Sequence, residues 1–248
     1  MAVFEGSLFS ESLRMNTSLF VILPDSSDRR DENGDLPVLY LLHGLSDNHA
    51  NWVYNTGIVR YAQAAGMAVV MPEVQRSFYC DMAYGLQYYR YVAEELPAAC
   101  RRLFRITDRP EGSYVAGLSM GGYGALKLAL RSPGRFAAVG SFSGAVDIKA
   151  RLGDPSAQTP EIYGINGGRL AAEDDLFLLT AKAAKEHLST PALYLTCGLS
   201  DFLYEDNRRF CRQLDFLKIP YVYEEWAGSH EWGFWDRSIK QFLQFISG

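Results

Sequence analysis

The segment Gly117-Leu118-Ser119-Met120-Gly121 has the residue types and spacing that nucleophilic catalysis needs. Apolar residues 114–116 precede it as a predicted strand, and residues 123–130 follow it with a helical pattern. A sharp turn from strand to helix holds a serine in a strained conformation with its Oγ exposed, and small residues must flank it where the backbone turns tightly. We therefore predict that Ser119 is a nucleophile; the alternative is a structural serine in a glycine-rich turn.

A serine hydroxyl becomes a good nucleophile only when a base accepts its proton, and histidine is the usual base. Of the four histidines, His230 is the best candidate, because it lies in a loop between the last predicted strand and the last predicted helix. His43 and His49 belong to a different loop, and His187 lies at the end of a helical stretch. We predict that His230 is the base; the alternative is a loop histidine bonded to a backbone carbonyl group.

The base needs an acid to orient it, and this acid should follow a strand between the serine and the histidine. Asp201 lies four residues beyond the apolar run 193–197 and directly before a helical pattern, so we predict it for this role. Its alternative role is a helix N-cap, which is common for aspartate at such a position. Three other aspartates fit less well, because they lie inside the helix or in an irregular segment: Asp174, Asp175 and Asp206.

Acyl transfer also needs two backbone N–H groups that face the developing negative charge. We predict Met120, which follows the serine, as one donor and Leu45 as the other. Leu45 lies in the loop after the apolar run 38–42, where Gly44 leaves the backbone free to turn. His43 is expected to organise this loop. The sequence has no phosphate-binding lysine loop, H-E-x-x-H or G-x-G-x-x-G, so we predict no metal and no cofactor.

Alternating strand and helix patterns must position these residues. The predicted strands are residues 38–42, 68–71, 113–117, 137–143, 192–197 and 221–224, and the predicted helices are 57–65, 82–104, 121–131, 202–217 and 235–246. Strands that are apolar on both faces are typical of a buried parallel sheet with helices on both sides. Residues 3–9 and 17–23 alternate in polarity and predict an antiparallel N-terminal ribbon.

We therefore predict an α/β protein with a mostly parallel central sheet, built as a single domain over residues 1–248. Residues 147–190 interrupt the alternation with several prolines and glycines, followed by a short helical stretch over 175–186. We expect this segment to be a cap-like excursion over the carboxyl edge of the sheet.

Taken together, these motifs resemble the esterase D-like group of α/β-hydrolases, in particular bacterial tributyrin esterases and related acetyl and feruloyl esterases. The resemblance covers nearly the whole chain and includes Tyr40-Leu41-Leu42-His43-Gly44, Arg76-Ser77-Phe78-Tyr79, the run from Gly117 to Ala125, and the Asp201 and His230 segments. It implies an α/β-hydrolase fold and the same roles for Ser119, His230, Asp201, Leu45 and Met120.

The expected function is a serine carboxylesterase that hydrolyses short acyl esters (acetyl or butyryl) or feruloyl esters through an acyl-enzyme. S-formylglutathione hydrolases resemble this chain too, but they usually carry a cysteine in the loop that here reads 43–47, so thioester hydrolysis is the second choice. Mycolyltransferase-like relatives are exported, and no signal segment is visible here. A non-catalytic ligand-binding protein is the alternative from another class. Four aromatic residues are weak candidates for substrate contacts, because such residues more often serve core packing than ligand contact: Tyr79, Tyr84, Phe177 and Trp232.

The composition narrows the other partners. The net charge is −5 and the basic residues are scattered, which argues against nucleic-acid binding. No run approaches the about 20 apolar residues of a membrane span, so we expect a small-molecule ester as the partner and no membrane. The four cysteines are far apart and no export signal precedes them, so we expect free thiols in a cytoplasmic protein. A homodimer or homotetramer is compatible with the sequence.

Overall fold

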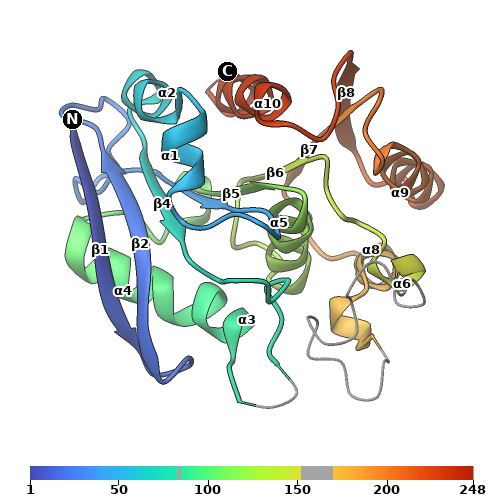
Figure 1. Ribbon diagram of the computed structural model, residues 1–248, viewed down its shortest axis with the longest axis horizontal. Helices are drawn as coiled ribbons and strands as arrows, with labels where there is room; N and C mark the ends of the chain where they lie inside the picture. Colours follow the sequence, from blue (N-terminus) through green and yellow to red (C-terminus); the bar gives the residue numbers. More distant parts are fainter. Residues whose placement is uncertain (83–84, 152–169, 248) are drawn as a thin grey trace.

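The computed structural model describes residues 1–82, 85–151 and 170–247, whose strands form one eight-stranded sheet in the order β1-β2-β4-β3-β5-β6-β7-β8 (Figure 1). The strands are β1 (Ala2–Ser10), β2 (Met15–Leu23), β3 (Val38–Leu42), β4 (Ala68–Pro72), β5 (Ser113–Leu118), β6 (Ala138–Phe142), β7 (Ala192–Gly198) and β8 (Tyr221–Trp226). The α-helices are α1 (Asn51–Asn55), α2 (Ile58–Ala65), α3 (Tyr88–Arg90), α4 (Leu96–Phe104), α5 (Met120–Arg131), α6 (Ile148–Arg151), α8 (Leu176–Lys185), α9 (Tyr204–Leu217) and α10 (Trp232–Phe245). A π-helical segment, η1 (Tyr91–Glu95), joins α3 to α4, and the 3-10 turns are η2 (Pro110–Gly112) and η5 (Ala172–Asp174).

Strand direction follows the predicted pattern. β1 pairs antiparallel with β2, and β2 pairs antiparallel with β4. All pairs from β4 through β3, β5, β6 and β7 to β8 are parallel. The mostly parallel sheet with an antiparallel N-terminal ribbon is therefore confirmed. Because the central strands are parallel, their carboxyl ends meet at one edge of the sheet, and loops from several strands converge there.

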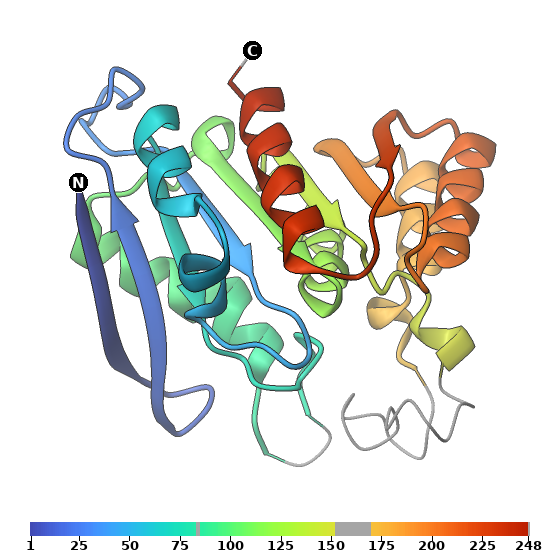
Figure 2. The same ribbon diagram turned by 45° about the horizontal axis from the view of Figure 1, so that its top comes forward.

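Helices cover both faces of the sheet, and the side chains of each central strand alternate between two apolar clusters. In β3, Val38, Tyr40 and Leu42 pack into the cluster that includes α4, α5, α8 and α9, whereas Leu39 and Leu41 pack against α1, α2 and α10. Figure 2 shows α2 and α10 side by side in front of the sheet. Burial on both faces explains why these strands are apolar throughout.

The helix predicted over residues 82–104 is shorter and less regular than expected. Asp81 pairs with Gln87 in an isolated bridge, the Met82 N–H donates to the Leu86 carbonyl oxygen, and α3 begins only at Tyr88. Pro97 lies at the start of α4 and has no N–H to donate. The π-helical segment η1 directly precedes α4. A missing donor interrupts the regular α-helical ladder. The short helix α1 was not predicted.

The segment predicted as an excursion lies between β6 and β7, and its described parts are α6, η5 and α8. Helix α8 packs against α5 and α9. Residues 152–169, the centre of the predicted cap, lie outside the described residues, as does Tyr84. All four cysteines are buried free thiols, as predicted. Among the described helices, none combines the length and apolar character needed to cross a membrane.

Candidate active site

Ser119 lies at the turn between β5 and α5, at the edge of the sheet where the parallel strands end. Its backbone has φ 52° and ψ −115°, a conformation that non-glycine residues rarely adopt. Its N–H donates to the Phe142 carbonyl oxygen at 2.9 Å, and its own carbonyl oxygen accepts from the Tyr123 N–H at 3.1 Å. These two hydrogen bonds hold the strained turn in place, and the side chain remains partly exposed.

The two flanking glycines are required by close backbone contacts. A Cβ on Gly117 would lie 2.5 Å from the carbonyl carbon and oxygen of Gly121, and a Cβ on Gly121 would lie 2.3 Å from the Leu42 oxygen. Helix α5 therefore starts directly against the end of β3. The G-x-S-x-G spacing reflects this steric requirement as well as the exposure of the serine.

His230 and Asp201 complete a hydrogen-bonded chain with Ser119. The His230 Nε2 lies 3.0 Å from Ser119 Oγ, and Nδ1 lies 2.9 Å from Asp201 Oδ2 and 3.1 Å from Oδ1. Because an ionised carboxylate can only accept, Nδ1 carries the hydrogen and Nε2 is free to accept from Ser119. Burial raises the pKa of Asp201, but the hydrogen bond and charge of His230, with the Leu203 N–H at 2.8 Å, outweigh it and hold the pKa below its usual value.

The loops that carry His230 and Asp201 are fastened to each other. The Leu199 N–H donates to the Trp226 carbonyl oxygen at 3.1 Å, and the Ser200 N–H donates to the Gly228 carbonyl oxygen at 3.0 Å. A Cβ on Gly198 would lie 2.5 Å from that same Gly228 oxygen, so a glycine is needed for this approach. The distance between acid and base is thus set by backbone contacts between the ends of β7 and β8.

Aromatic rings surround the His230 imidazole. The Phe202 ring centroid lies 4.5 Å from that of His230, and Trp235 meets the imidazole edge-to-face at 4.9 Å. Trp232 contacts Trp235 at 5.2 Å and Trp52 at 5.3 Å, so it is one ring removed from the histidine. Of these aromatic residues, only Trp232 was predicted from the sequence as a candidate for substrate contact; Phe202 and Trp235 were not.

The loop after β3 carries the predicted oxyanion donor Leu45. Within the described residues, no acceptor takes the N–H of Leu45 or of Met120, which begins α5. The Gly44 N–H donates to Asp47 Oδ2 at 3.3 Å. A Cβ on Gly44 would lie 2.6 Å from Cδ1 of Leu118, the residue that directly precedes Ser119. The Leu45 loop and the Ser119 turn are therefore neighbours, and two N–H groups are available there for a ligand oxygen.

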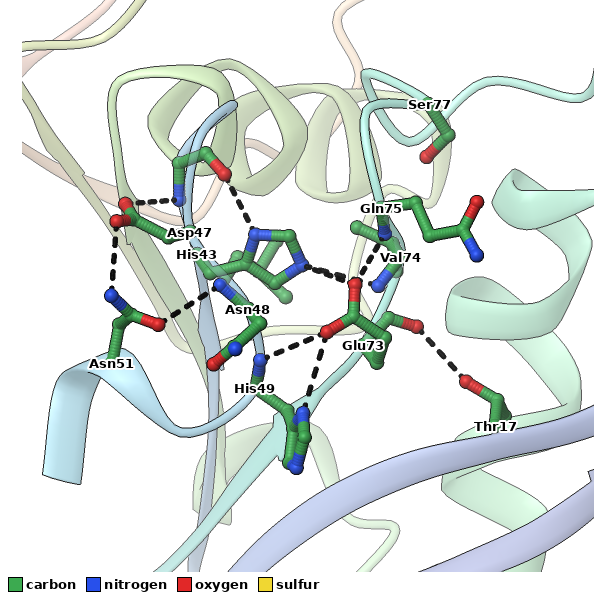
Figure 3. A network of polar contacts seen from close by, with 12 residues as sticks. Thr17, His43, Asp47, Asn48, His49, Asn51, Glu73, Val74, Gln75 and Ser77 are labelled. Carbon is green, nitrogen blue, oxygen red and sulfur yellow. Dashed lines mark hydrogen bonds and ion pairs between the residues drawn. The ribbon is translucent and has the colours of Figure 1, made fainter.

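A polar network beneath this loop holds it to the end of β4 (Figure 3). The fully buried His43 donates from Nδ1 to the Gly44 carbonyl oxygen at 2.7 Å, and its Nε2 lies 3.1 Å from the Val74 backbone nitrogen. Glu73 lies 3.5 Å from that Nε2 and accepts from the backbone and ring nitrogens of His49 at 3.2 and 3.3 Å. Burial raises the pKa of Glu73, but His43 and the N–H groups of Gln75 and His49 lower it to about 2. His43 thus organises the loop, as its position predicted.

Tyr79 belongs to this support and not to the substrate surface. Its side chain is 0% exposed, and its hydroxyl donates to the His43 carbonyl oxygen at 2.9 Å. A Cβ on Gly124 would lie 2.4 Å from the Tyr79 ring, so the ring fills the space above α5. The prediction that Tyr79 contacts substrate is wrong, because helix α5 and the loop after β3 enclose it. Phe177 packs edge-to-face on Phe210 at 5.5 Å, in the contact between α8 and α9.

This arrangement can perform acyl transfer. Nε2 of His230 can accept the Ser119 proton as the oxygen attacks a carbonyl carbon, and the ionised Asp201 stabilises the imidazolium that results. The two N–H groups of Leu45 and Met120 can stabilise the tetrahedral oxyanion. Among the described residues, no group of three histidine, cysteine or acidic side chains could hold a metal ion.

Known proteins match the chain over its whole length. Residues 10–246 match the family model described as "Putative esterase". An acetyl esterase of Caldicellulosiruptor saccharolyticus is 31% identical, with 100% of this chain and 98% of that protein covered. The fluorophosphonate-binding serine hydrolase F (FphF) of Staphylococcus aureus superposes with a TM-score of 0.91 at 31% identity, covering 100% of this chain and 98% of that one. The S-formylglutathione hydrolase (FrmB) of Staphylococcus aureus gives 0.87 at 32% identity, covering 100% and 99%.

The fold and the serine turn define a serine hydrolase of the α/β-hydrolase fold. Its activity is carboxylic ester hydrolysis, so the ligand-binding alternative is not retained. The chain belongs to the esterase family whose model it matches.

Three residues near the site were not predicted from the sequence: Glu73, Phe202 and Trp235. Glu73 directly follows β4, and residues after parallel strands gather at one edge of the sheet, so this signal was present. Phe202 directly follows the predicted acid. Trp235 was assigned to the start of the last helix without a role, and it lies in the first turn of α10, shortly after His230 in the chain.

Proposed function

We propose that this chain hydrolyses short-chain acyl esters through an acyl-enzyme on Ser119, with His230 as the base and Asp201 as its orienting acid. The hydrogen-bonded chain with 3.0 Å between Ser119 Oγ and His230 Nε2 and 2.9 Å between Nδ1 and Asp201 carries this proposal. In the first step, Ser119 Oγ attacks the carbonyl carbon and its proton moves to Nε2. Nε2 then protonates the departing alcohol, and a water molecule hydrolyses the acyl-enzyme with His230 again as base.

Leu45 and Met120 are the proposed oxyanion donors. Each such donor usually contributes about 10²–10³-fold to the rate. Their N–H groups have no acceptor among the described residues, and the close approach of Gly44 to Leu118 supports their convergence beside the serine.

The acetyl esterase relative supports an acetyl group as the acyl part. Butyryl and feruloyl esters remain within the proposed range. A second candidate is thioester hydrolysis of S-formylglutathione, which the 32% identity to the Staphylococcus aureus enzyme supports. Both reactions use the same acyl transfer to serine, and they differ in the acyl group, which is formyl in the thioester, and in the leaving group, which is a thiol in place of an alcohol.

Purified wild-type protein should be compared with Ser119→Ala and with Ser132→Ala, a control at the opposite end of α5. The panel contains p-nitrophenyl acetate, butyrate and octanoate, methyl ferulate and S-formylglutathione. We expect turnover of acetate and butyrate by wild type and by the control, and none by Ser119→Ala. A fluorophosphonate probe should label wild type and Ser132→Ala but not Ser119→Ala. Retained hydrolysis by folded Ser119→Ala would refute the nucleophile, and rates rising to octanoate would refute the short acyl group.

A further inference from the structure

The loop between β7 and α9 exposes a phenyl ring beside the catalytic histidine. Phe202 is 67% exposed, although its ring centroid lies only 4.5 Å from that of His230, at an interplanar angle of 52°. Scattered exposed apolar side chains are common on protein surfaces and need no explanation. The position of this one requires an account, because an imidazole that transfers protons to a substrate has the substrate beside it.

The exposed ring is held in a defined position. Its two neighbours in the chain, Asp201 and Leu203, are both buried. The Asp201 side chain accepts the Leu203 N–H at 2.8 Å, and this hydrogen bond fixes the backbone on either side of Phe202. The Arg151 guanidinium carbon lies 5.7 Å from the ring centroid. Arg151 is paired in turn with Asp206 of α9 at 2.9 Å. A ring that contacts both an imidazole and an anchored guanidinium has lost much of its freedom before any ligand binds, so a ligand contact costs little further order.

Proton transfer determines which part of an ester meets this ring. When the tetrahedral intermediate collapses, His230 Nε2 donates to the leaving oxygen, which must then lie within about 3 Å. The alcohol portion therefore starts beside the imidazole that Phe202 contacts. The acyl portion starts at the carbonyl carbon, between Ser119 Oγ and the two proposed oxyanion donors. Met120 begins α5 and Leu45 lies in the loop after β3, so the acyl portion starts among different elements from those that carry Phe202.

We propose that Phe202 is a specificity-determining residue that contacts the alcohol portion of the ester and favours apolar, above all aromatic, leaving groups. The inference rests on the proposed function, since it assumes that His230 protonates the leaving group. Contacts between aromatic rings typically change an equilibrium by about 2- to 10-fold. An effect of that size on kcat/KM is expected for an aromatic alcohol and not for a methyl ester.

The test uses alkyl acetates that form the same acetyl-enzyme: benzyl acetate and methyl acetate, with p-nitrophenyl acetate and butyrate as a separate acyl series. The variants are Phe202→Ala and Phe202→Leu. Phe216→Ala is the matched control, because Phe216 is 82% exposed at the end of α9. We expect Phe202→Ala to lower kcat/KM for benzyl acetate by about 3- to 10-fold and for methyl acetate by less than about 2-fold. The leucine variant should fall between, and the butyrate-to-acetate ratio should not change.

Deacylation gives a further expected result, because the acetyl-enzyme has already lost its alcohol. Its rate should be the same in Phe202→Ala and wild type. An equal loss for benzyl and methyl acetate, together with slower deacylation, would overturn the proposal, since Phe202 would then only orient His230. A changed butyrate-to-acetate ratio, or no change with any ester, would overturn it as well. Failure of the proposed function is separate, because it would leave Ser119→Ala active.

Discussion

Replacing Glu73 by glutamine removes the negative charge beneath the loop after β3 while keeping the size of the side chain. This loop carries the proposed oxyanion donor Leu45 and is called the oxyanion loop below. The carboxylate is 19% exposed and contacts both His43 and His49 of that loop. Burial raises the pKa of this carboxyl group, but His43 and the N–H groups of Gln75 and His49 together outweigh burial and lower the pKa from 4.5 to about 2. At 1.36 kcal/mol for each pH unit, this difference corresponds to about 3 kcal/mol in favour of the folded state.

The sign follows from the direction of the shift. A carboxyl group with a lowered pKa in the folded protein stabilises that protein above its unfolded pKa, here about 4.5. This stabilisation is lost as the pH falls toward about 2, where the folded protein takes up the proton too. The Glu73→Gln variant lacks the charge at every pH. We therefore expect it to be less stable than wild type by up to about 3 kcal/mol near pH 7, and the gap to shrink between about pH 4.5 and pH 2.

Urea unfolding followed by tryptophan fluorescence near pH 7, 5 and 3 measures this gap. Glu5→Gln is the control, because Glu5 is 55% exposed and contacts only His49 among the loop residues, at 3.4 Å; we expect less than about 1 kcal/mol. The activity of Glu73→Gln should fall mainly in kcat, since the loop carries the Leu45 N–H that acts in the transition state. A gap that stays the same from pH 7 to pH 3, or no gap at all, would refute the reasoning.

Two further variants probe charges at other positions. Asp201→Asn should lower kcat by about 10³–10⁴-fold with the fold retained, because the imidazole loses its ionised acceptor. The control Asp215→Asn on α9 should stay active. An active Asp201→Asn would contradict the assignment of Asp201 as the orienting acid. Lys127 is fully buried and bonds Asp174 at 2.8 Å and Cys80 at 2.9 Å. Lys127→Met should cost about 3 kcal/mol in urea unfolding, with partial recovery when Asp174→Asn is added, and a loss below about 1 kcal/mol would show that the pair is not structural.

The central strands and the nucleophile could be predicted because their signals are local. Burial on both faces favours strands in which nearly every residue is apolar, and this property is visible in β3 and β4 and in all but the first residue of β5. The turn at Ser119 requires small residues on both sides, because Gly117 and Gly121 meet backbone atoms. Helix boundaries were less predictable, since α3 begins only at Tyr88, after the bridge between Asp81 and Gln87.

His230 and Asp201 could be selected from the order of strands and helices, because parallel strands place the loops that follow them at one edge of the sheet. Their separation could not be derived in the same way. It depends on hydrogen bonds from Leu199 to the last residue of β8 and from Ser200 to the loop after β8, between residues far apart in the chain. The hydrogen-bond distances that support the proposed mechanism are therefore a property of the assembled sheet.

The sequence by itself determined the class of chemistry, since the G-x-S-x-G turn and the strands around it depend on residues that are close together in the chain. Only the tertiary structure decided what surrounds the turn. It enclosed Tyr79 beneath the oxyanion loop, brought Glu73 against His43, and left the Phe202 ring exposed beside His230. An aromatic or acidic residue has the same letter in a core, a support or a binding surface, and only the packing of distant segments against it decides which of these it becomes.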